Sequence, residues 1–235
     1  MSSFVLVHGA WHGSWCWKRV RKALQTEGHN VFTPTLTGLA ERSHLLAREI
    51  DLETHILDVL NLIQWEELSD VVLCGHSYGG CVVTGVADRI PERIHALVYL
   101  DAFVPEDNEN VLQHVPKEQL DQLLEGTRNI GEGWKVPPIP AEVFNVNEED
   151  RDWVNSQCTM QPMETFQQCI HLSGGISKID NIVYIRATGF EEGSPFPPFQ
   201  EKARAAGWKT LEIACGHDVM LDEPDQLTAA LIDAA

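Results

Sequence analysis

The amino-acid sequence predicts an α/β protein with a mostly parallel sheet, flanked by helices and covered by a helical cap. Short apolar runs alternate with helical segments along most of the chain, which indicates βαβ units. The run at residues 71–74 is continuously apolar, as expected of a parallel strand that is buried on both faces. Residues from about 105 to 173 interrupt this rhythm without a clear strand. We therefore expect a single domain over residues 1–235, with residues 105–173 inserted as the cap.

Strands and helices are expected to alternate from the N-terminus onward, joined by right-handed crossovers. Apolar runs predict strands at residues 4–7, 31–34, 71–74, 96–100, 182–185 and 211–214. Helices are predicted at residues 17–27, from residue 52 onward, from residue 80 to about 90, and from about 223 to 234. Asp51 precedes the second helix as a cap, while Gly28 ends the first helix and Pro91 ends the third.

The charge and the apolar runs exclude several classes of partner. The formal net charge of −18 repels phosphate backbones and anionic lipid headgroups, so we expect neither nucleic acid nor a membrane as a partner. No segment reaches the ~18 consecutive apolar residues of a membrane span. The first apolar run has no basic stretch before it and is interpreted as a strand rather than a signal peptide, which predicts a cytoplasmic protein.

The cysteines and histidines do not predict a metal site. The six cysteines include no CxxC pair, and in a long chain without a secretion signal we expect them to be free thiols. His8 and His12 have no acidic partner at a useful spacing in the sequence, which argues against zinc.

The clearest chemical signal is the pentapeptide 75–79, Gly-His-Ser-Tyr-Gly. It matches G-x-S-x-G, a sharp turn between a strand and a helix that exposes a nucleophilic serine. Glycine at positions 75 and 79 lets the backbone close tightly, and the N-terminus of the next helix favours developing negative charge. An apolar strand precedes the motif and a helical segment follows it. Ser77 is therefore the predicted nucleophile.

A serine nucleophile needs a base and two donors for the oxyanion. His217 follows the last predicted strand and precedes the last helix, where the order serine, acid, histidine places the base. Tyr78, directly after the nucleophile, is expected to supply one backbone N–H, and Ala10, in the loop after the first strand, the other. His76 lies inside the motif, and we interpret it as structural support that faces away from the serine.

The opening of the chain resembles that of a known family. Residues 4–13, Phe-Val-Leu-Val-His-Gly-Ala-Trp-His-Gly, and the Trp-Cys-Trp at 15–17 are similar to the plant methylesterase and hydroxynitrile lyase family and its bacterial esterase relatives. Residues 34–38, 75–80, 99–105 and 216–218 extend the resemblance, which is weakest across the cap. It implies an α/β-hydrolase fold, no cofactor and hydrolysis of small carboxylic esters. The bacterial relatives include hydrolases of pyrethroid esters and of the methyl carbamate carbendazim.

Two positions depart from the lyase members of that family. The lyases carry threonine where this chain has Gly9, and lysine directly after the catalytic histidine, where this chain has Asp218. A lysine would supply positive charge for departing cyanide, which an aspartate cannot do. The resemblance therefore favours an esterase, with a hydroxynitrile lyase as a less favoured alternative.

The acid that supports His217 is left open between two residues. Most family members have an aspartate after the strand that here covers residues 182–185, but this chain has glycine and phenylalanine near that place. Glu191 lies close by and is longer. Asp101, directly after the strand at 96–100, is the preferred choice, because a group of haloalkane dehalogenases of this fold carries its acid at that strand end. Asp218 is expected to be solvated.

The cap is expected to line a substrate pocket that takes an apolar or aromatic acyl group. Trp11 and Phe103 lie beside the predicted active-site segments and are expected to wall the pocket. Each apolar cap residue can instead serve to pack cap helices together. The candidates from the cap are Trp134, Phe144, Trp153, Met160, Met163 and Phe166.

These residues together predict a serine hydrolase that cleaves a small carboxylic ester or methyl carbamate through an acyl-enzyme intermediate. A rival from another class is a hydrolase-like receptor that binds a small molecule with little turnover. Serine at position 77 excludes a dehalogenase, which needs an acidic nucleophile there. The sequence leaves the particular substrate and the oligomeric state open.

Overall fold

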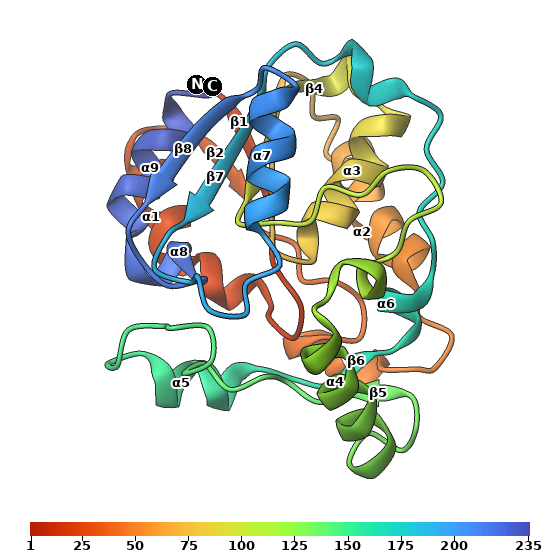
Figure 1. Ribbon diagram of the computed structural model, residues 1–235. Coiled ribbons are helices and arrows are strands. Elements are labelled where there is room, and N and C mark those ends of the chain that lie inside the picture. Colours follow the sequence, from red (N-terminus) through yellow and green to blue (C-terminus); the bar gives the residue numbers. More distant parts are fainter.

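In the computed structural model, which describes residues 1–235, six strands form one sheet whose neighbouring pairs are all parallel (Figure 1). The strand order is β2-β1-β3-β4-β7-β8, so β3 and β4 lie at the centre. The predicted α/β class with a mostly parallel sheet is confirmed. The strands of the sheet are β1 (Ser3–Val7), β2 (Asn30–Phe32), β3 (Val71–His76), β4 (Ile94–Leu100), β7 (Ile182–Ala187) and β8 (Lys209–Ile213).

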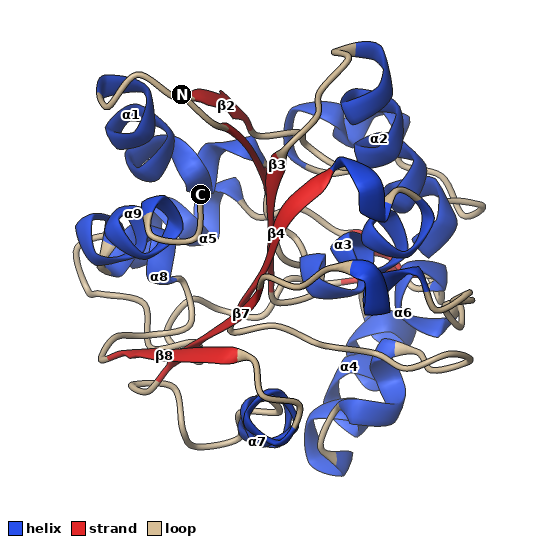
Figure 2. Cartoon of the chain, turned by 90° about the horizontal axis from the view of Figure 1, so that it is seen from above, coloured by secondary structure: helices blue, strands red, loops and turns tan.

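Helices cover both faces of the sheet (Figure 2). Successive side chains of a strand point to opposite faces, so Val71 and Leu73 of β3 belong to one apolar core, and Val72 and Cys74 to the other. All four side chains are fully buried. One face is covered by α1 (Lys18–Thr26), α9 (Pro224–Ile232) and the short α8 (Val219–Asp222), and the other by α2 (Leu52–Trp65), α3 (Gly79–Arg89) and α7 (Pro197–Ala205).

Two features differ from the sequence prediction. No helix is predicted at residues 197–205, where the structure has α7. Prolines crowd the start of this segment as in a loop, but Pro197 and Pro198 occupy the first helical turn, where an N–H has no helical partner. No strand is predicted within residues 105–173, yet β5 (Lys135–Val136) and β6 (Gln161–Pro162) pair antiparallel there. Strands of two residues are too short to produce an alternating pattern.

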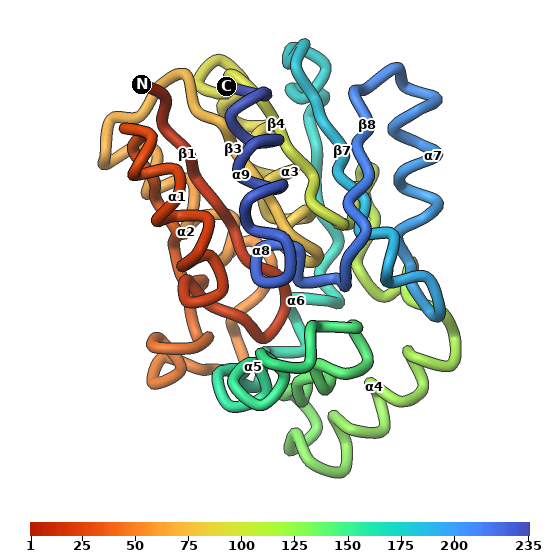
Figure 3. The backbone as a smooth tube through the Cα atoms, turned by 90° about the vertical axis from the view of Figure 1, so that its left-hand side faces the viewer, coloured from red at the N-terminus to blue at the C-terminus, as the bar shows by residue number.

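Residues 105–173 lie mainly beyond the carboxyl ends of the strands, where Figure 3 shows α4 (Lys117–Asn129) and α5 (Arg151–Gln157). The short α6 (Glu164–Gln167) packs against α2. Parallel sheets bind ligands at the carboxyl ends of their strands, so this segment faces the edge where a site is expected. A membrane-spanning helix is not found among these elements, since none combines the necessary length and hydropathy.

Candidate active site

Ser77 stands on the turn between β3 and α3, where the backbone is strained. Its φ of +54° lies in the left-handed region that side-chain-bearing residues rarely adopt. A Cβ on Gly75 would lie 2.5 Å from the carbonyl oxygen of Gly79, and a Cβ on Gly79 would lie 2.7 Å from that of His8. Glycine is therefore required at both positions. The turn places Ser77, which is partly exposed, on the wall of a cavity.

His217 lines the same cavity, in the loop between β8 and α8. Its Nδ1 lies 2.7 Å from Oδ2 of Asp101, so Nδ1–H donates to the carboxylate and Nε2 remains available as a base. The ring stacks on Phe196 with 4.9 Å between the ring centroids. The backbone N–H of His217 donates to the carbonyl of Phe144 at 2.9 Å. These contacts fix both the tautomer and the orientation of the imidazole.

Asp101 directly follows β4 and is fully buried. Its Oδ1 accepts hydrogen bonds from Nη1 of Arg186 at 2.6 Å and from the N–H of Ala187 at 3.2 Å. These bonds, with the one from His217, offset the cost of burying the charge. Glu191, the alternative acid, has a side chain that is 65% exposed and lies 3.7 Å from Arg186. The structure thus brings Asp101, and not Glu191, into hydrogen-bond contact with His217.

The backbone N–H groups of Ala10 and Tyr78 donate to no acceptor within the protein, and both residues line the cavity. The peptide that follows Ala10 is held at both ends. Its carbonyl oxygen accepts a hydrogen bond from Nδ1 of His12 at 2.7 Å, and its N–H, from Trp11, donates to Oε1 of Gln161 at 2.9 Å. Trp11 itself has a φ of +63°. The loop is therefore fixed while the N–H of Ala10 stays free for a ligand.

The cavity has a volume of about 290 Å³ and an apolar wall. No Asp, Glu, Lys or Arg lines it, although charged residues make up 22% of the chain. Trp11 and Phe103, two of the predicted pocket residues, form part of the wall on the sheet side. Residues 137–140 and Leu123 of α4 form part of the opposite wall. The cavity therefore suits a small, uncharged ligand.

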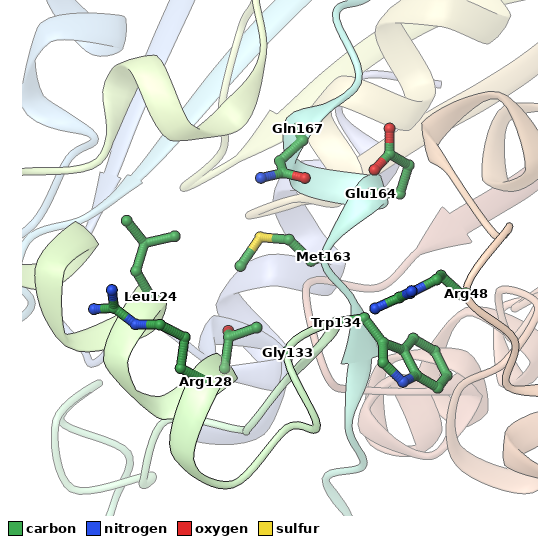
Figure 4. Close-up of a pocket in the computed structure, with 9 residues that line it drawn as sticks. Arg48, Leu124, Arg128, Gly133, Trp134, Met163, Glu164 and Gln167 are labelled. Carbon is green, nitrogen blue, oxygen red and sulfur yellow. The ribbon is translucent and has the colours of Figure 1, made fainter.

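The other two predicted pocket residues, Trp134 and Trp153, lie outside this cavity, and that prediction is wrong. Trp134 lines a second cavity of about 430 Å³, which it shares with Leu124 of α4 (Figure 4). The ring of Trp153 instead packs edge-on against Trp15. The apolar character of a residue in the segment 105–173 does not show which of the two cavities, if either, its side chain faces. Of the remaining cap candidates, Phe144 and Phe166 line the first cavity, Met163 lines the second, and Met160 lines neither.

A buried ion pair lies beside this site. Nε2 of His12 is 3.0 Å from Oδ2 of Asp218, which is fully buried, so the expectations of a solvated Asp218 and of a His12 without an acidic partner are wrong. Burial lowers the pKa of His12, but the Asp218 carboxylate and the Ala10 carbonyl together outweigh burial and raise it above its ordinary value. His76 donates from Nε2 to the carbonyl of His217 at 3.0 Å, and burial lowers the pKa of His76 well below its ordinary value. His76 is therefore a neutral support for the loop that carries His217.

Comparison with known proteins places this geometry in a family. Residues 4–231 match the model of the Alpha/beta hydrolase family. The chain belongs to this family. The chain is 47% identical to a carbendazim hydrolyzing esterase of Nocardioides sp. (strain SG-4G), over 98% of both chains. It is also 34% identical to an alpha-hydroxynitrile lyase of Arabidopsis thaliana, over 55% of this chain and 48% of that one.

The fold agrees with a solved member of the family. An extracellular alpha/beta-hydrolase from a Paenibacillus species superimposes with a TM-score of 0.87 at 24% identity, covering 100% of this chain and 99% of that chain. The predicted resemblance to esterases of the alpha/beta hydrolase family and the predicted fold are thus confirmed.

Two residues of this alpha/beta hydrolase site are missing from the sequence prediction. Arg186 holds Asp101, and its signal was a charged residue inside the apolar run of β7, which indicates a buried partner of opposite charge. Gln161 holds the loop of Ala10 from 150 positions away, and nothing in the irregular sequence around it marks that contact.

Proposed function

We propose that this alpha/beta hydrolase is a serine esterase that cleaves small, neutral carboxylic esters and methyl carbamates through an acyl-enzyme intermediate. One observation carries the proposal: a strained serine, Ser77, an imidazole, His217, and two free backbone N–H groups all border one apolar cavity. Asp101 supports that imidazole from the side away from the cavity. Acyl transfer to a serine requires this set of groups.

In the proposed reaction, Oγ of Ser77 attacks the carbonyl carbon while Nε2 of His217 takes the hydroxyl proton. The N–H groups of Ala10 and Tyr78 stabilise the oxyanion that forms. The C–O bond to the leaving alcohol then breaks, and His217 passes its proton to that alcohol. Water attacks the acyl-enzyme by the same route, with His217 again taking a proton, and the acid leaves Ser77. Asp101 stabilises the imidazolium that forms in each half of the cycle.

The character of the cavity supports small and neutral substrates. Its volume of about 290 Å³ lies at the lower end of ligand sites. A substrate that carries a charge would lose its hydration on entry without a countercharge in the wall. Methyl carbamates enter the proposal because a relative with 47% identity hydrolyses carbendazim. Expulsion of the charged acid after deacylation is favoured by the same apolar wall.

Two further expectations belong to the proposal. Residues 105–173 act as a cap, which is supported by their position beyond the carboxyl ends of the strands. The reaction proceeds without a cofactor, because the residues around Ser77 supply the nucleophile, the base and the oxyanion donors.

A lyase activity has less support than ester hydrolysis. A Cβ on Gly9 would lie 2.9 Å from both Nδ1 of His76 and Cβ of Ser77, so the turn leaves no room for a threonine in its present form. The side chain of Asp218 points toward His12 and does not line the cavity. The wall holds no cation that would stabilise departing cyanide. A measurement of ester turnover distinguishes the esterase from the receptor alternative, because such a receptor binds its ligand with little turnover.

The decisive test uses Ser77→Ala and short p-nitrophenyl esters. We expect kcat/KM to fall by about 10⁴- to 10⁶-fold, because the nucleophile is lost. A serine-directed phosphonate should label the wild-type protein at Ser77, seen as an added mass, and leave the variant unlabelled. The unchanged melting temperature of the variant controls for folding. Wild-type protein that is neither labelled nor active, or a variant that keeps its activity, would contradict the proposal.

The substrate class is tested separately with a panel of methyl esters, pyrethroids and aryl methyl carbamates. Each neutral ester should be compared with an analogue that bears a free carboxylate of similar size. The apolar wall predicts that the charged analogue has the higher KM. Equal KM values for the two would contradict the proposed preference for neutral substrates.

A further inference from the structure

Both ring nitrogens of His12 face oxygen acceptors. Nδ1 lies 2.7 Å from the carbonyl oxygen of Ala10, and Nε2 lies 3.0 Å from Oδ2 of Asp218. A neutral imidazole has a single N–H, so it would set a lone pair against one of these oxygens. The imidazolium form donates to both. His12 is 3% exposed and Asp218 is 0% exposed, so a cation and an anion are enclosed together.

No other group beside the pair supplies a compensating charge. Burial lowers the pKa of His8 to about 3 and that of His76 well below its ordinary value, so both are neutral. Burial also raises the pKa of Cys16 well above its ordinary value and that of Cys158 to about 12, so both remain thiols. His217 has a carboxylate partner of its own in Asp101. The charge on His12 therefore depends on Asp218.

The pair joins the two halves of the proposed machinery. His12 holds the carbonyl of Ala10, and the peptide plane after Ala10 shares a Cα with the plane whose N–H faces the cavity. Asp218 directly follows His217 in the chain. The bond to His12 fixes the plane after Ala10, which restricts the backbone rotations at that Cα and so limits the directions open to the free N–H. A single ion pair links the direction of the oxyanion donor to the loop that carries the base.

We propose that His12 and Asp218 are positioning residues, which hold the N–H of Ala10 in line and tie its loop to the loop of His217. Neither side chain lines the cavity, so the pair acts through its neighbours and not on the substrate. The inference rests on the proposed esterase function. Below its raised pKa, His12 donates both hydrogen bonds. Above that pKa, one bond is lost and turnover declines, which gives the pH profile an alkaline limb.

The test is Asp218→Asn, which removes the charge but keeps the shape. The amide can donate to Nε2 of a neutral His12, so the variant keeps a hydrogen bond and is expected to fold. The bond to the carbonyl of Ala10 is then no longer charge-assisted, and we expect kcat to fall about tenfold with KM changed less than about threefold. Because His12 is already neutral in the variant, its kcat profile should lack the alkaline limb.

A second readout does not need activity. Nitrogen-15 NMR of the histidine rings should show His12 as an imidazolium in the wild-type protein that persists above the ordinary titration range of histidine, and Asp218→Asn should abolish it. Asp88→Asn is the matched control, because Asp88 is a buried carboxylate at the far end of α3 that accepts bonds from Ser173 and Gly175. It should lower stability and leave kcat and the alkaline limb unchanged.

The outcomes separate this inference from the proposed function. If the wild-type protein turns over no ester, the esterase proposal fails. In that case the NMR spectrum still tests the charged His12–Asp218 pair, because a neutral His12 would show that the pair does not exist. If the wild-type protein is active and Asp218→Asn keeps its kcat and its alkaline limb, the positioning role is wrong. If kcat falls equally in Asp218→Asn and in Asp88→Asn, the cause is a general loss of stability, and the positioning role is again wrong.

Discussion

The loops at the carboxyl ends of the strands and the segment 105–173 meet at one cavity but are built differently. The residues of the loops at positive φ, Trp11, Ser77 and Asp101, lie at the site and make buried hydrogen bonds through Trp11 and Asp101. The segment also has side-chain-bearing residues at positive φ, but none of them lines the cavity. The segment contributes mostly prolines and other apolar side chains to the cavity, with Gln119 and Gln122 as its polar members, and its Ile130 remains 65% exposed at the cavity. Directional bonds dominate the first region and non-directional apolar contacts the second.

Under the proposed function, this difference separates the chemistry of the reaction from the selectivity for the substrate. Strained backbone persists where the surroundings over-determine it, and the central strands β3 and β4 are buried on both faces. Such a frame can hold a nucleophile, a base and oxyanion donors within the small tolerances of a reaction. Apolar contacts tolerate changes of shape more readily, so the segment 105–173 can vary the substrate without changing the reaction.

Trp11 connects the two regions, because it lies in a strand-end loop and bonds to the segment 105–173. Its N–H donates to Gln161, its carbonyl accepts from Thr159, and its indole N–H donates to the carbonyl of Val136. All three partners belong to the segment 105–173. The segment therefore helps to hold the loop of Ala10 as well as lining the cavity.

The largest effect is expected in the strand-end region, for Asp101→Asn. The amide no longer stabilises the imidazolium of His217 and disturbs its tautomer, so we expect kcat to fall about 10³- to 10⁴-fold. Arg186 also loses its buried partner, which should lower the free energy of unfolding by about 3 kcal/mol. Steady-state kinetics and urea unfolding measure the two effects.

Glu191→Gln is the matched control for that prediction. Glu191 is exposed and does not contact His217, so its variant should keep kcat within about twofold, as most surface substitutions do. If Glu191→Gln lost the activity and Asp101→Asn kept it, the assignment of the acid would be reversed.

An intermediate effect is expected at the boundary, for Gln161→Leu. The substitution leaves the buried N–H of Trp11 without an acceptor, which costs about 1–3 kcal/mol of stability. The loop of Ala10 then keeps its bonds to His12 and Thr159 but loses the one at the N–H of Trp11. We expect kcat to fall about tenfold, the effect of about 1.4 kcal/mol on the barrier. Thr165→Val removes the group that accepts from the other end of the Gln161 amide and should have a smaller effect. Equal losses in the two variants would show that general packing, and not the Trp11 contact, matters.

The strand-end region was also the more predictable part of the molecule. The G-x-S-x-G motif depends on glycines that no other residue can replace in that turn, so Ser77 follows from local sequence. His217 follows from strand order, which βαβ connectivity restricts strongly. The choice between Asp101 and Glu191 was open, because it depends on how far a side chain reaches between neighbouring strands. Arg186, which donates a hydrogen bond to Asp101, lies outside the G-x-S-x-G motif.

The segment 105–173 resisted prediction for physical reasons. Its helices expose different sides to different cavities, and the sequence gives only their apolar character. Trp134 and Trp153 were expected in the substrate pocket on that basis, and neither lines it. Asp218 was expected to be solvated because its partner, His12, lies 206 positions away in the chain. Long-range polar pairs of this kind leave no periodic signal.

The smallest effect is expected within the segment, for Leu123→Ala. Leu123 and Leu124 are consecutive in α4 and both half-buried, but Leu123 lines the cavity that contains Ser77, and Leu124 lines the second cavity. Loss of part of the apolar contact with the substrate should cost about 1 kcal/mol and raise KM about fivefold. The chemistry on the strand side is untouched, so kcat should not change.

Leu124→Ala tests whether this effect belongs to the cavity or to the helix. Both variants remove the same atoms from α4 and should lower the melting temperature by similar amounts. A rise in KM confined to Leu123→Ala would show that the segment selects substrates through the wall that it presents. An equal rise in KM in both variants would mean that α4 acts as a unit. A fall in kcat in Leu123→Ala would contradict the separation of chemistry from selectivity.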